Sequence, residues 1–231
     1  MPDVKPVVVY SIMGVTILVF LLQLATESMM GFDVPAAVGM KVNELIIRGQ
    51  VWRLFTPMLL HASVLHIGFN MYALYALGPL LERNYGHGRF LLLYLLSGFA
   101  GNVLSFLFSP AFSLGSSTAV FGVLAAEGMF LYQNRQVFGS AAQRALGNII
   151  TVALINLVIG LSPGIDNWGH LGGLIGGVLF AWLSGPILRL EGISPNLQAV
   201  DTRDASDVVR GVLVVALVFG LLAAGTIYMR M

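Results

Sequence analysis

The chain has 231 residues, of which 57% are hydrophobic and only 10% are charged, and its formal net charge is +1. Soluble domains carry about 25% charged residues, so this composition indicates a polytopic membrane protein. The small net charge gives no reason to expect a nucleic-acid partner. The lack of cysteine excludes disulfides, thiolate metal sites and cysteine nucleophiles.

The segment Met1–Lys5 is too short and too weakly basic for a cleaved signal peptide, so the apolar run from Val7 is interpreted as a retained first span. Hydropathy marks seven candidate spans of about 16–22 residues, near the length that crosses a bilayer. They are Val7–Leu24, Leu65–Leu81, Phe90–Phe108, Ser117–Tyr132, Leu146–Leu161, His170–Leu188 and Val208–Met229.

Basic residues in the connections predict the orientation of these spans. Eight of them lie inside and four outside if the N-terminus is cytoplasmic and the C-terminus is outside, and this excess favours that orientation. The inside set is Lys5, Arg83, Arg89, Arg135, Arg144, Arg189, Arg203 and Arg210, and the outside set is Lys41, Arg48, Arg53 and Arg230. The second, fourth and sixth spans then all begin at the outer face.

Residues 1–231 are predicted to form one all-α membrane domain. It comprises a six-helix core over about residues 7–188, a polar tether over 189–207 and a seventh transmembrane helix over about 208–229. The long connection from Glu27 to His61 interleaves apolar and charged residues, as expected for an element that lies in the membrane interface.

Two spans open on residues that could perform chemistry together. Ser117 begins the fourth span and His170 begins the sixth, and polar groups at membrane depth are costly and usually functional. A hydroxyl near an imidazole is the minimum equipment for nucleophilic acyl transfer. A lone serine could instead bond back to a helix carbonyl, and the histidine could be a structural link between helices.

Small residues around both positions favour a close approach of the two spans. Gly115 and Gly122 flank the serine, and the sixth span carries faces of small residues that let membrane helices touch. These are Gly172, Gly173, Gly176 and Gly177. The fourth span is short, about 24 Å at 1.5 Å per residue. Its polar start is therefore expected below the outer surface, in a water-filled cavity.

An acyl-transfer site also needs hydrogen-bond donors for the oxyanion. Unpaired N–H groups at the helix start could supply them, and His66 and Asn70, four apart on one helix face, could add side-chain donors. His61 is expected in another environment, where a packing role is at least as good an interpretation. The histidines have no partners at metal-ligand spacing, so no metal and no cofactor is predicted. Asp166 falls in a loop, so the spacing favours a dyad without an orienting carboxylate.

These residues together resemble the rhomboid family of intramembrane serine proteases, from Trp52-Arg53 through His170-Leu171-Gly172-Gly173. The similarity includes the His-x4-His-x3-Asn arrangement, the segment Gly78-Pro79-Leu80-Leu81-Glu82-Arg83 and the Gly115-x-Ser117 motif.

The resemblance implies a nucleophile, a base and their supporting residues. Ser117 is the expected nucleophile, His170 the expected base, and His66, Asn70 and Gly115 the expected oxyanion and substrate-positioning residues. The supporting residues are Phe121 against the histidine, Trp52 and Arg53 in a membrane-embedded first loop, and Asn167. The implied activity is an endopeptidase that cuts transmembrane segments of membrane-anchored proteins near the outer face. The expected location is a bacterial plasma membrane.

One position departs from the family pattern, which usually has glycine after the nucleophile. Thr118 stands there, and its side chain could crowd the oxyanion site or cap the helix through its hydroxyl. The first alternative function is an inactive rhomboid-like protein that binds transmembrane clients. A small transporter would explain a polar cavity but not the pairing of Ser117 with His170.

Overall fold

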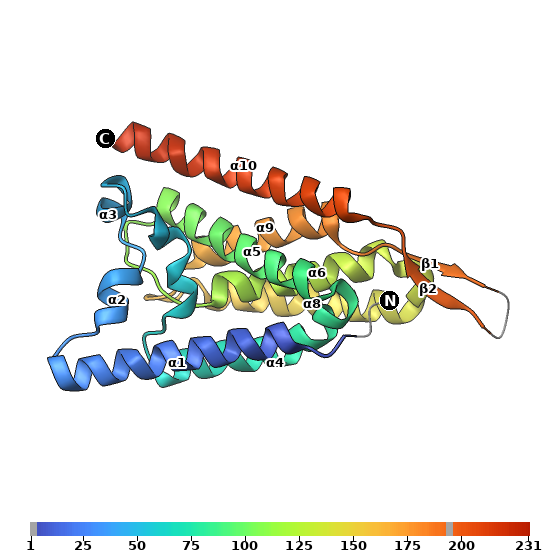
Figure 1. Cartoon of the computed structure of the whole chain (residues 1–231), viewed down its shortest axis with the longest axis horizontal. Helices are drawn as coiled ribbons and strands as arrows, with labels where there is room; N and C mark the ends of the chain where they lie inside the picture. The colour runs from blue at the N-terminus through green and yellow to red at the C-terminus, as the bar shows by residue number, and fades with distance from the viewer. Residues whose placement is uncertain (1–3, 193–195) are drawn as a thin grey trace.

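The computed structural model describes residues 4–192 and 196–231, and it is almost entirely helical (Figure 1). The expected N-terminal segment before residue 4, and the part of the expected tether at 193–195, lie outside the described residues. The long helices are α1 (Val7–Met30), α4 (Val64–Tyr85), α5 (His87–Phe108), α6 (Ser117–Gln133), α8 (Ser140–Ile159), α9 (Asn167–Ser184) and α10 (Ala205–Arg230).

Within the described residues, five of these helices are long and apolar enough to cross a membrane, namely α1, α4, α5, α8 and α10. The other two expected spans correspond to α6, which has only 17 residues, and α9, which opens on polar residues. Both helices lie in the centre of the bundle, where neighbouring helices cover them. The architecture is that of a polytopic membrane protein, as the composition predicts.

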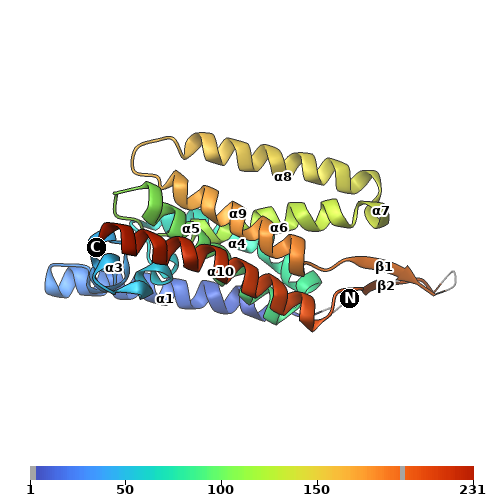
Figure 2. The same ribbon diagram turned by 90° about the horizontal axis from the view of Figure 1, so that it is seen from above.

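The core of the bundle is the group α5, α6 and α9. α5 is the most enclosed of the five candidate spans, with 78% of its most apolar window buried. Figure 2 shows α8 along one edge and α1 along the opposite edge, while α10 crosses over α9 and α5. α8 buries only 6% of its corresponding window, so most of its surface is free to face lipid.

The connection before α4 folds into short helical pieces. They are α2 (Val34–Gly39), α3 (Asn43–Ile47), η1 (Val51–Leu54) and η2 (Thr56–Leu59), all at the end of the bundle that holds the C-terminus (Figure 1). Asp33 starts α2 by accepting the N–H of Ala36 at 2.9 Å. Prolines follow the starts of α2 and η2, where a missing N–H costs nothing.

The segment after α9 differs from its prediction. α9 ends at Ser184 rather than at Leu188, because Pro186 cannot continue a helix. The chain then forms an antiparallel hairpin from β1 (Leu188–Glu191) and β2 (Gln198–Asp201) within the segment predicted as a polar tether. Leu188 pairs with Asp201 and Glu191 with Gln198. A short helix, α7 (Arg135–Phe138), connects α6 to α8.

The start of α1 is completed by a residue of α4. Pro6 precedes α1 without a side-chain cap, which leaves the first N–H groups of the helix without partners in their own segment. Glu82 is fully buried and accepts the N–H of Val8 at 2.9 Å and that of Val9 at 2.8 Å. One carboxylate therefore binds the end of α4 to the beginning of α1.

Candidate active site

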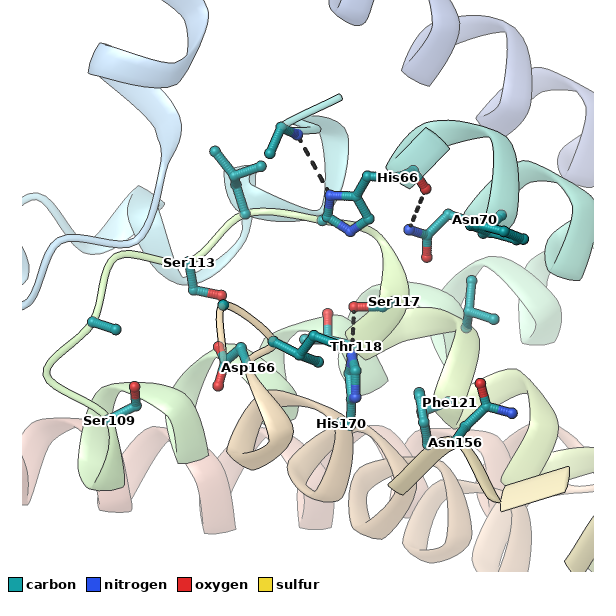
Figure 3. A pocket seen from close by; sticks show the side chains of 18 of the residues that line it. His66, Asn70, Ser109, Ser113, Ser117, Thr118, Phe121, Asn156, Asp166 and His170 are labelled. Atoms are coloured by element: carbon teal, nitrogen blue, oxygen red, sulfur yellow. Dashed lines mark hydrogen bonds between the residues drawn. The ribbon is translucent and has the colours of Figure 1, made fainter. Parts of the chain in front are cut away.

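Ser117 and His170 meet where two helices begin. Ser117 is the first residue of α6, and His170 lies in the first turn of α9. The Nε2 atom of His170 is 2.9 Å from the hydroxyl oxygen of Ser117 (Figure 3). The two residues are 53 positions apart in the chain, so their contact depends entirely on how α6 packs against α9.

Glycines in α9 allow this packing at backbone contact. A Cβ atom on Gly173 would lie 1.9 Å from the carbonyl oxygen of Thr118, and one on Gly177 would lie 2.4 Å from that of Gly122. Real Cβ atoms do not approach so closely, so any larger residue would push the helices apart. Of the four glycines predicted to form small-residue faces, Gly173 and Gly177 thus pack against the helix that starts at Ser117. Gly172 and Gly176 pack against α5 at Ala100.

The His170 ring is held by an aromatic ring rather than by a carboxylate. Phe121, one helical turn after Ser117, stacks on it with ring centroids 4.3 Å apart and planes inclined by 12°. The Nδ1 atom of His170 is buried and has no hydrogen-bond partner among the described residues. Ser117 and His170 are thus paired without a third residue bonded to the imidazole.

A cavity of about 720 Å³ contains this pair. Its walls come from α4, α6, α8, the start of α9 and the loops before α6 and α9. They include His66, Asn70, Gly115, Ser117, Phe121, Asn156, Asp166 and His170. Phe69 on α4 and Asn156 on α8 line it and are also exposed, so the cavity reaches the surface at both helices.

His66 presents an N–H group toward the start of α6. Its Nδ1 atom accepts the backbone N–H of Ala62 at 3.4 Å, so the neutral ring carries its proton on Nε2. A Cβ on Gly115 would lie only 2.8 Å from that Nε2 atom, and Gly115 has φ of +138°, so glycine is needed here for both reasons. The histidine therefore packs on the turn that leads into Ser117.

Asn70 lies one turn below His66 on α4. Its side-chain amide donates to the carbonyl oxygen of His66 at 2.9 Å, and the residue is only 6% exposed. One N–H of the same amide group is left for another acceptor at the cavity. Figure 3 shows the amide on the side of the cavity that faces Ser117.

His61 is buried outside the cavity lining, as its predicted packing role implies, but it lies closer to His66 than the sequence suggested. Its ring centroid is 5.0 Å from that of His66, and its Nε2 atom is 3.2 Å from the hydroxyl of Ser116. His61 precedes α4, which begins only at Val64, so the helix geometry that would separate residues five positions apart does not apply to it. Burial lowers the pKa of His61 to about 3, so the ring is neutral and can accept a hydrogen bond beside the serine turn.

The supporting residues of the first loop lie away from the cavity. Arg53 is 3% exposed and donates to the carbonyl oxygens of Met40 at 2.7 Å and Ala37 at 2.8 Å. Trp52 donates its indole N–H to Val38 at 3.1 Å. These bonds hold the loop together. Asn167 also lies outside the cavity lining.

Thr118 packs into the contact between α5 and α9. It is 3% exposed, and its side chain lies against the backbone positions of Gly101 and Gly169. Its hydroxyl has no hydrogen-bond partner among the described residues, so the suggestion that it caps α6 is wrong. The N-cap position belongs to Ser116, one residue before the helix.

Sequence reasoning missed several polar residues behind the site. Gln23 of α1 is 2% exposed, and its amide bonds the N–H of His61 at 3.0 Å and the carbonyl of the same residue at 3.2 Å. A buried amide in an otherwise apolar span was the available signal. Lys41, Ser105 and Asp166 form a second group, which lies behind the start of α9.

Comparison with known proteins gives a consistent family. Residues 48–187 match the model of the rhomboid domain. The chain is 43% identical over 179 residues to rhomboid protease GluP of Bacillus subtilis, which covers 77% of this chain and 34% of that protein. It is 41% identical over 143 residues to RHOMBOID-like protein 1 of Arabidopsis thaliana, covering 62% of this chain and 36% of the relative.

A third relative is the chloroplastic RHOMBOID-like protein 9 of Arabidopsis thaliana, 33% identical over 159 residues, or 68% of this chain and 37% of the relative. The chain thus spans little more than a third of the length of these three relatives. The domain match includes the helices that carry Ser117 and His170 and covers more than half of the chain. This integral membrane protein belongs to the rhomboid family.

Proposed function

We propose that the protein is an intramembrane serine endopeptidase that cleaves transmembrane segments of membrane-anchored proteins with Ser117 as nucleophile and His170 as general base. The observation that carries the proposal is the 2.9 Å approach of the imidazole to the hydroxyl inside a cavity bounded by membrane helices. An activated serine requires this pairing of a hydroxyl with a base in hydrogen-bond reach.

The first step is attack of the Ser117 oxygen on the scissile carbonyl carbon, while His170 takes the hydroxyl proton on Nε2. The carbonyl oxygen then becomes an oxyanion, and the first N–H groups of α6, the Asn70 amide and the Nε2–H of His66 are the available donors. His170 returns its proton to the leaving amine as the C–N bond breaks. A water molecule, activated by the same imidazole, then hydrolyses the acyl-enzyme.

The cavity supports entry of a substrate helix from the bilayer. It reaches the surface at Phe69 of α4 and at Asn156 of α8, and α8 packs only loosely on the bundle. A peptide bond inside an intact helix is tied into the i→i−4 hydrogen bonds, so it must unwind before a serine can reach it. Water in the cavity solvates the freed backbone groups, which lipid could not do. Substrates with Gly or Pro near the outer end of their span are therefore preferred.

The proposed setting is a bacterial plasma membrane, with the N-terminus of the chain in the cytoplasm and the C-terminus outside. The charge excess in the connections supports this orientation. In it, the starts of α4, α6 and α9 lie toward the outer face, at the end of the bundle that carries α2 and α3 (Figure 1). The cut should therefore fall in the outer part of the substrate span.

The test uses purified protein in detergent or liposomes with a single-span substrate that carries Gly near its outer end. Wild type should cleave it, with the site mapped by mass spectrometry to the outer part of the span. It should also react with a fluorophosphonate at Ser117. Ser117→Ala and His170→Ala should each abolish cleavage while keeping the melting temperature. Normal turnover by either variant, or substrate binding by wild type without turnover, contradicts the proposal; the second outcome supports the inactive, client-binding alternative.

A further inference from the structure

Asp166 lies directly behind His170. It occupies the N-cap position of α9, where its Oδ1 atom accepts the N–H of Gly169 at 3.0 Å and its Oδ2 atom accepts the hydroxyl of Ser105 at 2.5 Å. Its backbone carbonyl accepts the N–H of His170 at 3.1 Å. The residue lines the same cavity as Ser117 (Figure 3), yet no bond joins its carboxylate to the His170 ring.

A buried ammonium group holds this carboxylate through Ser105. Lys41 is fully buried, and its Nζ atom donates to the hydroxyl oxygen of Ser105 at 2.9 Å and to the carbonyl oxygen of Ser109 at 2.9 Å. Because the ammonium can only donate, the Ser105 hydroxyl accepts from Lys41 and must donate its own proton to Asp166. The three groups thus form one directed chain that ends at the start of α9.

The charge of Asp166 affects how easily the proposed base, His170, becomes protonated. His170 lies in the first turn of α9, where the positive end of the helix dipole disfavours a positively charged ring. Removing the proton of Ser117 creates such a ring. A negative charge at the N-cap opposes the dipole at the same helix end, and it does so without occupying either nitrogen of the imidazole.

Resting on the proposed function, we propose that Asp166 is a positioning residue for catalysis: its charge, held by Ser105 and Lys41, stabilises the protonated state of His170 that forms during proton transfer. It is not the third member of a triad, because it does not contact the ring. Charges at helix ends typically change such equilibria by factors from about 2 to about 30. The negative charge at the N-cap should act near the upper part of this range, since the site is partly buried.

Asp166→Asn separates this role from simple capping of α9. Asparagine can keep the bond to Gly169 through its one amide oxygen, so α9 stays capped, whereas the charge and the second oxygen, which accepts the Ser105 hydroxyl, are lost. The expected result is a kcat about fivefold to thirtyfold lower with unchanged KM. Labelling of Ser117 by a fluorophosphonate should slow by a similar factor, because that reaction needs the same proton transfer but no peptide substrate.

Asp204→Asn is the matched control. Asp204 is also an N-cap aspartate, at the start of α10, where it accepts the N–H groups of Ser206 and Asp207, and it does not line the cavity. Its replacement should leave kcat and labelling at wild-type values. Wild-type kcat in Asp166→Asn, or equal losses of activity in both variants, would overturn the proposal.

A double-mutant cycle with Ser105 tests the chain itself. Ser105→Ala frees the Asp166 side chain, so it should lower kcat in the wild-type background and have a smaller effect when residue 166 is already Asn. Independent, multiplicative effects would contradict the link through Ser105. If the proposed function itself is wrong, the wild-type protein will neither cleave nor label at Ser117, which is distinct from any of these outcomes.

Discussion

At the scale of single residues, the candidate site combines neutral hydrogen-bonding groups with the one proton that Ser117 shares with His170. His66 and Asn70 are oriented by bonds to the backbone of their own segment, and His61 is kept neutral by burial. In the proposed reaction, such preorganised groups need not rearrange when negative charge develops on the substrate oxygen, which is the main advantage of an enzyme site over water.

Asn70→Ala should lower kcat more than it raises KM, because the amide is proposed to bind the oxyanion and not the ground-state carbonyl. Loss of one such donor typically costs about 10²–10³ in rate, although His66 and the helix start remain as donors. Steady-state kinetics on a single-span substrate measure both constants. Tyr72→Ala, at an exposed residue of the same helix that does not line the cavity, is the control for general loosening of α4. An unchanged kcat in Asn70→Ala would remove this residue from the oxyanion site.

Sequence patterns selected the residues that line the cavity at Ser117 better than the polar residues that surround them. Ser117, His170, His66 and Asn70 could be selected because polar side chains at the starts of apolar spans are rare and costly. Ser116, Lys41 and Asp166 could not, since each lies in a loop or at a helix boundary where polar residues are ordinary. Their importance comes from long-range contacts, such as the 64 positions between Lys41 and Ser105, and no local pattern encodes these.

At the scale of elements, the contact of α6 with α9 decides whether the hydroxyl and the imidazole meet. The carbonyl groups of Thr118 and Gly122 lie against Gly173 and Gly177, so the two helices touch along one side. The glycine pattern of the sequence predicted this contact. The end of α9 could be read from Pro186, but the hairpin that follows could not be predicted, because strand pairing between residues 188 and 201 leaves no local pattern in this charged segment.

Gly173→Ala should abolish activity by separating α6 from α9. Its new Cβ would meet a backbone oxygen at 1.9 Å, which only a shift of the helices can relieve. We expect loss of cleavage and of fluorophosphonate labelling, with a melting temperature lowered by several degrees. Gly220→Ala in α10 is the matched control, because nothing lies within 4 Å of the added atom. Wild-type labelling in Gly173→Ala would show that the dyad does not depend on this contact.

At the scale of the whole molecule, cationic side chains join the ends of helices that are distant in sequence. Arg203 donates to the carbonyl oxygens of Trp182 and Leu183 at the end of α9, and Arg230 donates to those of Phe106 and Leu107 at the end of α5. Arginines near the two ends of α10 therefore bind the C-terminal carbonyl groups of two core helices, α9 and α5. Positive groups at helix C-termini are favourable because carbonyl groups there lack partners.

Because of Lys41, the free energy of unfolding should vary with pH in the alkaline range. Burial lowers its pKa to about 8, with Asp166 opposing that shift and Arg230 adding to it. Between pH 8 and about 10.5, the unfolded chain holds a proton that the folded protein has released, so stability should rise with pH relative to a chain without this lysine. The measured quantity is the melting temperature of wild type minus that of Lys41→Met, which should grow over this interval. The same trend for the exposed Lys5→Met would contradict the assignment to Lys41.

The cap that Glu82 provides for α1 has a consequence for biogenesis. Glu82 follows Val9 by 73 positions, so at about 5–20 residues per second it is synthesised roughly 4–15 s after Val9, at the start of the helix that it completes. An unpaired N–H group inside lipid costs several kcal/mol, so the start of α1 must stay in contact with interfacial water during this time. α1 can settle to its final depth only after the far end of α4 arrives. Insertion of the two helices is thereby ordered in time, and a ribosome stalled before residue 82 would hold α1 at the bilayer boundary.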